Sequence, residues 1–241
     1  MQNPHTRAGR PAFTLVELLV VIGIIAVLVA LLLPVLGKAT RQSRTISGLS
    51  NQRTLLQAVQ MYVAENQTYL PPGQFNIGTG DWQTVLNGYL NRGGPDWSSQ
   101  SGQNKVFLDP SATIPRSSRH FSVHPVLMPM INMGNPNYQK ILRVRRPSDL
   151  MLITDGTQQG SGSNRGFVQQ RAWAVDGIFT APANLSRRIN SGPNIDAGVS
   201  PSAHIRFRQG NNDAANMAFV DGHAATMHMR EVLQKHVRVE R

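Results

Sequence analysis

A run of 24 residues from Phe13 to Leu36 is apolar apart from Thr14, Glu17, Gly23 and Pro34. As an α-helix it would be about 36 Å long, which exceeds the ~30 Å hydrocarbon core of a bilayer. This length and composition predict a membrane-spanning helix. A buried helix of a soluble protein is the alternative interpretation.

Two arginines, Arg7 and Arg10, precede the apolar run. Because basic flanks stay in the cytoplasm, we expect a cytoplasmic N-terminus and a C-terminal part on the other side of the membrane. The run is longer than the ~7–15 apolar residues of a signal peptide. Cleavage at Gly37-Lys38-Ala39, which has the small-x-small pattern, is nevertheless a second alternative.

The chain has 241 residues, a formal net charge of +11 and no cysteine. It is long enough to bury a core without disulfides, and it has no thiolate nucleophile or cysteine metal site. Its basic residues are scattered, and aromatic residues do not alternate with them in a stripe. We therefore expect no nucleic-acid partner. The densest basic clusters are Arg143, Arg145 and Arg146, and Arg206 and Arg208.

After Pro34 the helical pattern continues but becomes polar, with an apolar stripe on one face. Gly48 is its weak point, at a cost of ~1 kcal/mol against Ala. The helix should end near Asn66, before Pro71-Pro72-Gly73. We expect one helix of about 50 residues, whose first half suits lipid and whose second half packs on a domain. The stripe consists of Ile46, Leu49, Leu56, Val59 and Val63.

Residues 73–140 are rich in Gly, Pro, Asn and Ser, which predicts loops with short strands such as Lys105–Leu108. Near the C-terminus Asp221-Gly222 separates two apolar segments and predicts a β-hairpin with a two-residue type I′ turn. Val220 would then pair with His223, and Phe219 with Ala224. Together with the long helix, these elements predict an α+β fold.

Catalytic and metal-binding patterns are weak. The sequence has no GxSxG, HExxH, phosphate-loop or dinucleotide motif. His223 and His228 would face opposite sides of a strand, and we interpret His120 and His124 as ordinary surface residues. We expect no enzyme activity and no cofactor; Ca²⁺ bound by C-terminal loop oxygens is the alternative. Four aspartates have turn-like Gly/Asn neighbours: Asp155, Asp176, Asp213 and Asp221.

The segment Ala12-Phe13-Thr14-Leu15-Val16-Glu17 resembles the processing site of type IV pilins and type II secretion pseudopilins. In that family a prepilin peptidase cuts before the apolar run and the new terminal Phe, here Phe13, is N-methylated. Glu17 is the fifth residue after the cut, as in the family. Pro34 is the twenty-second, where many members have a helix-bending Pro. The residue before the cut is usually Gly and is Ala12 here.

The resemblance implies a pilin-like α+β fold, in which a small antiparallel β-sheet domain with long loops follows a long helix. Residues 1–12 would be a cytoplasmic leader and 13–36 the transmembrane half of the helix. Residues 37–67 would be its extracytoplasmic half and 68–241 the globular β domain.

The implied function is a structural subunit of a type IV pilus or type II secretion pseudopilus. Its partners would be the prepilin peptidase, like or related pilin subunits and the bacterial inner membrane. It would cross that membrane once, with its C-terminal domain in the periplasm, and reach a cell-surface filament after assembly. The alternatives are a membrane-anchored ligand-binding module that does not polymerise and an enzyme on a membrane stalk.

In the family, the glutamate corresponding to Glu17 pairs with the terminal amine of a neighbouring subunit, which offsets the cost of its burial. The alternative interpretation is that Glu17 reaches the membrane interface from its own helix.

Four later segments resemble a large pseudopilin-like group. Its members often have Cys at Asp109 and near Gly48, which implies that this chain has lost one disulfide. They also have a "His, nine residues, Asp-Gly" motif, in which Asn211 here replaces the His. The four segments are Ser50–Arg53 with Met61-Tyr62, Tyr69–Pro72, Val106–Ser111, and Arg146-Pro147-Ser148 followed by a predicted strand at Leu150–Asp155.

Overall fold

The computed structural model describes residues 14–74, 81–90, 104–114, 120–129, 131, 138–158, 184–189, 194, 196 and 205–239. Its chain forms two compact units, residues 1–40 and 41–241, which we consider separately. The second is called the head below. The helix α1 (Leu15–Glu65, 51 residues) contributes to both and confirms the predicted long helix.

The end of α1 lies where Pro71-Pro72-Gly73 predicted it. Asn66 Nδ2 donates to the Tyr62 carbonyl at 2.8 Å, and the Thr68 N–H donates to the Val63 carbonyl at 3.0 Å. Gln67 and Thr68 have left-handed φ angles of 49° and 66°. Left-handed residues cannot continue a right-handed helix, so the chain turns away here.

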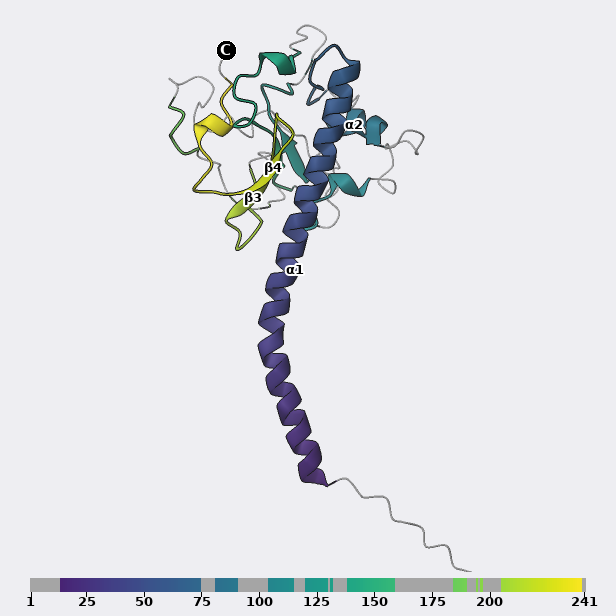
Figure 1. The fold of residues 1–241 in the computed structure, drawn as a ribbon, viewed down its shortest axis with the longest axis vertical. Helices are drawn as coiled ribbons and strands as arrows, with labels where there is room; N and C mark the ends of the chain where they lie inside the picture. Colours follow the sequence, from purple (N-terminus) through teal and green to yellow (C-terminus); the bar gives the residue numbers. More distant parts are fainter. Residues whose placement is uncertain are drawn as a thin grey trace, which may run out of the picture. The chain divides into compact units, whose positions relative to one another are not determined.

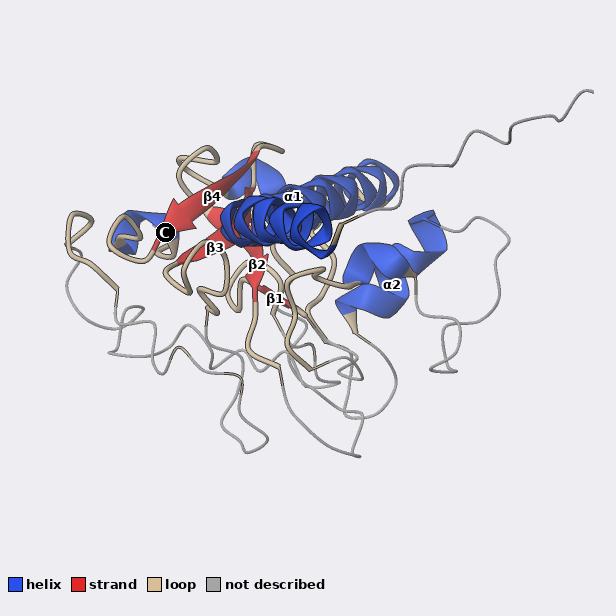
Figure 2. Cartoon of the chain, turned by 90° about the horizontal axis from the view of Figure 1, so that it is seen from below, coloured by secondary structure: helices blue, strands red, loops and turns tan. Residues whose placement is uncertain are grey.

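The head contains a four-stranded antiparallel sheet with the order β1-β2-β3-β4, of which Figure 1 labels β3 and β4 and Figure 2 labels all four strands. The α+β prediction is thus confirmed, as is the strand expected at Leu150–Asp155. The strands are β1 (Phe121–Val123), β2 (Met151–Asp155), β3 (Ala214–Phe219) and β4 (Ala224–His228). The short helices are α2 (Trp82–Leu90) and the one-turn 3₁₀ helices η2 (Lys105–Phe107), η3 (Ile141–Arg143) and η6 (Gln234–His236).

The sheet separates two apolar clusters. On one face, residues of α1 and α2 pack against the sheet, and Figure 2 shows α1 crossing the strands on this side. On the other face, Phe207 and Val237 pack against Met217 and Phe219. The alternation along β3 produces this division: Ala218 faces α1, whereas Met217 and Phe219 face away from it.

A β-bulge interrupts the same alternation in β2. Met151 pairs with Phe219, but Ile153 pairs with Ala218, so the register shifts between Met151 and Ile153. Met151 consequently joins the cluster facing away from α1, while Ile153 joins the cluster under α1. The bulge also directs Asp155, two residues beyond Ile153, toward α1, where it contacts Gln52.

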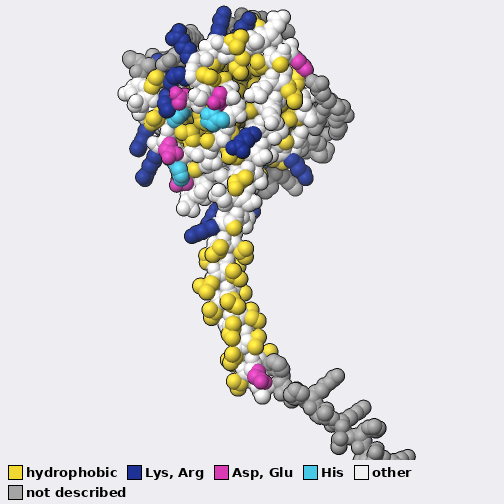
Figure 3. All heavy atoms as spheres, viewed as in Figure 1, with side chains coloured by type: hydrophobic (Ala, Val, Ile, Leu, Met, Phe, Trp, Pro, Cys, Tyr) yellow, Lys and Arg dark blue, Asp and Glu magenta, His cyan; other side chains and the backbone are white. Residues whose placement is uncertain are grey.

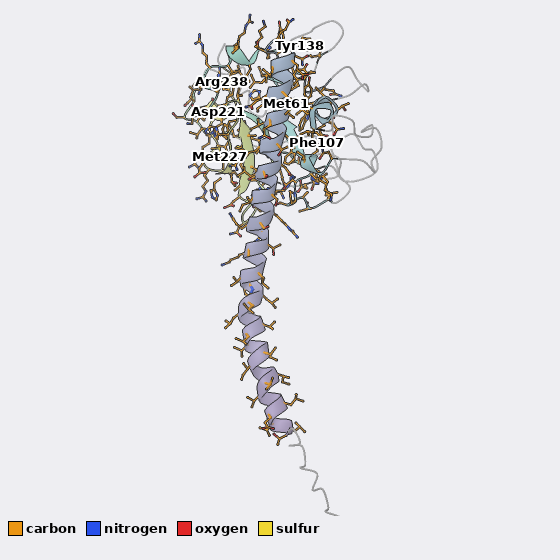
Figure 4. The ribbon with its side chains drawn as sticks, turned by 45° about the vertical axis from the view of Figure 1, so that its right-hand side comes forward. Met61, Phe107, Tyr138, Asp221, Met227 and Arg238 are labelled. Atoms are coloured by element: carbon orange, nitrogen blue, oxygen red, sulfur yellow. The ribbon has the colours of Figure 1, made fainter. Side chains whose placement is uncertain are left out.

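Two local predictions were wrong. Lys105–Leu108 is not a strand, because Asn104 caps a 3₁₀ turn by accepting the Val106 N–H at 3.1 Å. In the apolar stripe of α1, Leu56, Val59 and Val63 are buried and Leu49 is partly buried, but Ile46 is 57% exposed. Figure 4 places Phe107 of η2 and Met227 of β4 on opposite sides of α1.

The β3–β4 hairpin has a three-residue turn, 220–222, instead of the predicted two-residue turn. Ala218 pairs with Ala224, and the Phe219 N–H donates to the His223 carbonyl at 2.8 Å. The predicted pairs Phe219–Ala224 and Val220–His223 are therefore wrong by one residue.

The turn type also differs from the prediction, since only Gly222 has a positive φ, of 99°. Two long-range hydrogen bonds select this geometry. The Val220 N–H donates to the Leu150 carbonyl at 3.0 Å, and the Asp221 N–H donates to the Pro147 carbonyl at 3.2 Å. Both acceptors lie just before β2, so a contact between distant segments decides the turn.

We expect Gly222→Val to destabilise the head by about 1–3 kcal/mol, because a β-branched residue resists positive φ. A Cβ at this position would also lie 2.7 Å from Gln60 Nε2, which must move. Thermal unfolding of the full chain in nonionic detergent measures the effect. The matched control is Gly88→Val in α2, where a Cβ meets nothing within 4 Å. Equal melting temperatures for the two variants would contradict the hairpin geometry.

Candidate functional site

The first turn of α1 is closed by a reciprocal capping box between Thr14 and Glu17. The Glu17 N–H donates to Thr14 Oγ1 at 3.2 Å. In return, Glu17 Oε2 accepts the Thr14 N–H at 2.9 Å and the Thr14 hydroxyl at 2.8 Å. The Glu17 carboxylate thus has partners within its own helix and stabilises the helix N-terminus.

The residues after Glu17 present an apolar surface on all sides of the helix. Every large apolar side chain from Leu15 to Leu36 is between 45% and 80% exposed. Among the described helices, α1 is the one long and apolar enough to cross a membrane. The helix continues through Pro34, so the bend expected there stays a prediction. The predicted processing residues, Ala12 and Phe13, lie outside the described residues.

Within the head, three consecutive polar residues of α1 tie the helix to three different segments. Asn51 Nδ2 donates to the Leu108 carbonyl at 2.8 Å, and Arg53 Nη2 donates to the Ala224 carbonyl at 3.3 Å. Between them, Gln52 is fully buried, and its Nε2 donates to Asp155 at 2.9 Å. These residues belong to the segment Ser50–Arg53, so its polar character serves helix docking.

Gly48 has a packing role on the same face of α1. A Cβ there would lie 3.0 Å from Asn216 Nδ2 and 3.2 Å from Asp109 Oδ1. Gly48 and Asp109 therefore face each other. In this chain the absent Gly48 side chain leaves room for the Asp109 carboxylate.

Arg208 is the centre of a buried charge network that includes Asp109. Its Nη1 lies 2.8 Å from Asp109 Oδ2 and its Nη2 lies 3.1 Å from Asp196 Oδ1, with all three side chains at most 5% exposed. Arg206 Nε lies 3.1 Å from the other oxygen of Asp196. Arg208 thus forms ion pairs with Asp109 and Asp196, and Arg206 forms one with Asp196. The spacing of these residues in the sequence did not predict this role.

Asp155 is the third carboxylate of this network and is not the turn residue that its neighbours suggested. It ends β2 and is fully buried. Burial, followed by the charge of Asp109, raises the pKa of Asp155 to about 8, against the opposing effect of Arg208. Both oxygens of Asp155 accept hydrogen bonds, Oδ1 from Gln52 Nε2 and Oδ2 from Gln209 Nε2 and the Asn216 N–H.

Two histidines predicted at the surface are buried, at 4% and 0% exposure for His120 and His124. His124 Nδ1 accepts the Val126 and Leu127 N–H groups at 3.1 and 3.2 Å. Its Nε2 therefore carries the proton and donates to the Val237 carbonyl at 2.8 Å. Because this neutral ring has no contact with water, burial lowers the pKa of His124 to about 4.

We expect the contribution of His124 to the stability of the head to fall as the pH drops from 6.5 to 4, whereas the raised pKa of Asp155 acts in the opposite direction over this range. In this range an unfolded His124 binds a proton that the folded ring does not, which removes up to about 3 kcal/mol. Burial lowers the pKa of His236 to about 4 as well, which acts in the same direction. Denaturant midpoints of the full chain in detergent at pH 7 and pH 4 measure the loss.

The variant His124→Gln should be less stable at pH 7 but should lose less on acidification. His228→Gln is the control, because the His228 side chain is 59% exposed. An identical loss in wild type and His124→Gln would contradict the lowered pKa of the buried His124 ring.

The remaining candidate ligands do not converge. His223 Nδ1 lies 2.6 Å from Asp221, whereas His228 Nδ1 lies 3.5 Å from Asp213, so the two histidines have separate partners. Among the described residues, no three or more His, Asp or Glu side chains are grouped to hold a metal ion. Asp176 lies outside the described part, and Ca²⁺ binding stays untested.

Comparison with known proteins identifies the N-terminal segment. Residues 7–33 match the family model described as the prokaryotic N-terminal methylation motif. This motif supports a type IV pilin- or pseudopilin-like protein. No curated protein sequence and no solved structure matches it. The match includes Ala12, Phe13, Glu17 and the apolar run as far as Leu33, and it does not extend to the head.

Sequence reasoning missed several residues. The Thr-x-x-Glu pattern at Thr14–Glu17 is a visible capping-box signal that could have been recognised. The network around Arg208 had no such signal, because its partners come from separate segments. Those partners are Gln52, Asp109, Asp155, Asp196 and Gln209.

Proposed function

We propose that this protein is a pilin-like structural subunit, processed by a prepilin peptidase and assembled through its N-terminal helix. The observation that supports this most is the methylation motif at residues 7–33, placed at the start of a helix whose apolar side chains from Leu15 to Leu36 are exposed. Removal of residues 1–12 would take away Arg7 and Arg10 and leave a formal charge of +9 instead of +11. The filament would be a type IV pilus or a type II secretion pseudopilus.

In this proposal the head lies outside the cytoplasm and the N-terminus lies inside, because Arg7 and Arg10 precede the membrane segment. The apolar surface of α1 that lipid covers in the membrane would be covered by neighbouring helices in the filament. Such exchange needs no new chemistry, since helix packing and lipid contact bury the same side chains. The head would then form the outer surface of the assembly, as a structural part without a catalytic role.

Mass spectrometry of the mature protein tests the processing step. We expect an N-methylated Phe13 at the terminus of the wild-type protein. Ala12→Trp should block cleavage, because the peptidase must accept a small side chain before the cut, whereas Ala12→Gly should be processed normally. An intact Met1 terminus, or a mature chain beginning at Thr40, would contradict the proposal.

A further inference from the structure

Seven basic side chains gather on one part of the head, here called the basic face. They come from three segments, residues 143–149, 185–189 and 233–238, which contain one acidic residue, Asp149. Figure 3 shows dark blue Lys and Arg side chains along the left edge and top of the head, and Figure 4 labels Arg238. The seven are Arg143, Arg145, Arg146, Arg187, Arg188, Lys235 and Arg238.

Hydrogen bonds hold the three segments side by side. The Gln234 N–H donates to the Arg187 carbonyl at 2.8 Å, and Arg146 Nη2 donates to the Arg238 carbonyl at 3.4 Å. Lys235 Nζ lies 3.0 Å from Asp149 Oδ1. The hydrogen bond from Lys235, with further positive charges including Arg146, lowers the pKa of Asp149, as expected in a positive field.

Most of these cations are available to a ligand. Arg143, Arg145, Arg187 and Arg188 are exposed, and none of them pairs with a carboxylate within the part of the chain that the structure describes. Like charges held together repel one another unless an anion neutralises them. A second copy of this chain that docks through the same face would not, because it would bring an identical positive face.

We propose that the basic face binds an acidic polysaccharide through paired guanidinium–carboxylate contacts. Guanidinium groups bind carboxylates in a bidentate geometry, and a strip built from three segments suits a linear polymer with repeated charges. The choice of polymer rests on the proposed function in one respect, which is that the head lies outside the cytoplasm.

The side chains on and beside the basic face disfavour two other polyanions, a single-stranded nucleic acid and an anionic lipid surface. Single-stranded nucleic acids need aromatic side chains on which bases stack, and none of the described residues in these three segments is aromatic except His236, which is buried. A lipid surface needs a broad apolar face, whereas the large apolar side chains exposed beside the face, among the described residues, are Leu142 and the single aromatic Tyr138.

The test uses the full chain in nonionic detergent, titrated with polygalacturonate, with neutral dextran as the uncharged control. We expect binding of polygalacturonate alone, weakening with added salt. The triple variant Arg143→Gln, Arg145→Gln, Arg188→Gln should bind about tenfold more weakly or worse. The matched triple variant Arg41→Gln, Arg44→Gln, Lys105→Gln removes the same charge from exposed positions elsewhere on the head and should bind as wild type.

Equal losses in the two triple variants would overturn the proposal, since binding would then follow net charge alone. Tighter binding of an oligothymidylate or of a short-chain phosphatidylglycerol at equal charge would also overturn it, in favour of nucleic acid or lipid. Failure of the binding test leaves processing at Phe13 unaffected, because that is measured separately by mass spectrometry.

Discussion

Arg208→Gln is expected to cost about 3–5 kcal/mol of folding stability, because it leaves buried carboxylates without their shared cation. Arg208 bonds Asp109 at 2.8 Å and Asp196 at 3.1 Å, and its side chain is 1% exposed. Asp109→Asn should cost less, because Arg208 retains Asp196. Thermal and denaturant unfolding of the full chain in detergent measure both variants.

A double-mutant cycle sharpens this test. If Asp109 and Arg208 stabilise the head as a pair, the double variant Asp109→Asn, Arg208→Gln should lose less than the sum of the single losses. Arg230→Gln is the matched control at an exposed arginine and should change stability by less than about 0.5 kcal/mol. A melting temperature of Arg208→Gln equal to that of the control would contradict the network.

Glu17→Ala should leave cleavage and membrane localisation intact while abolishing multimers, if Glu17 pairs with the amine of Phe13 on a neighbouring subunit. Leaving that amine unpaired in a low dielectric would cost about 3–5 kcal/mol for each contact. The measurement compares cleavage, membrane fractionation and cross-linked or sheared multimers with those of the wild type. Normal multimers in Glu17→Ala would contradict the pairing role and favour an anchored module that does not polymerise.

The capping box between Thr14 and Glu17 calls for two further variants. Thr14→Ala removes the hydroxyl contacts of Glu17 but keeps its charge, whereas Glu17→Gln keeps a capping acceptor and removes the charge. Pairing between subunits predicts multimers in Thr14→Ala and none in Glu17→Gln. The opposite pattern would show that Glu17 acts on its own helix.

The neighbourhood of Gly48 shows how local and long-range information differ. From the sequence, Gly48 is only a weak position in a helix. In the structure its missing side chain makes room for Asp109, which pairs with Arg208. A position that costs helix stability locally therefore permits an ion pair between segments distant in the chain.

The geometry of the β3–β4 hairpin likewise depends on contacts with a distant segment. The sequence located Asp221-Gly222 in a turn, and Gly222 does have a positive φ. The number of turn residues and the register depended on hydrogen bonds from Val220 and Asp221 to the segment before β2. Spacing within one hairpin contains no information about those acceptors.

The sequence by itself determined the long helix, its end after Glu65, its apolar first half and the methylation motif, because these depend on composition, spacing and caps within short segments. Only the tertiary structure decided which polar residues are buried and which cations share a face. Gln52, His124 and Arg208 are buried because distant segments supply hydrogen-bond partners for Gln52 Nε2, for His124 Nε2 and for Arg208 Nη1 and Nη2, and such partners offset the cost of burying a polar group.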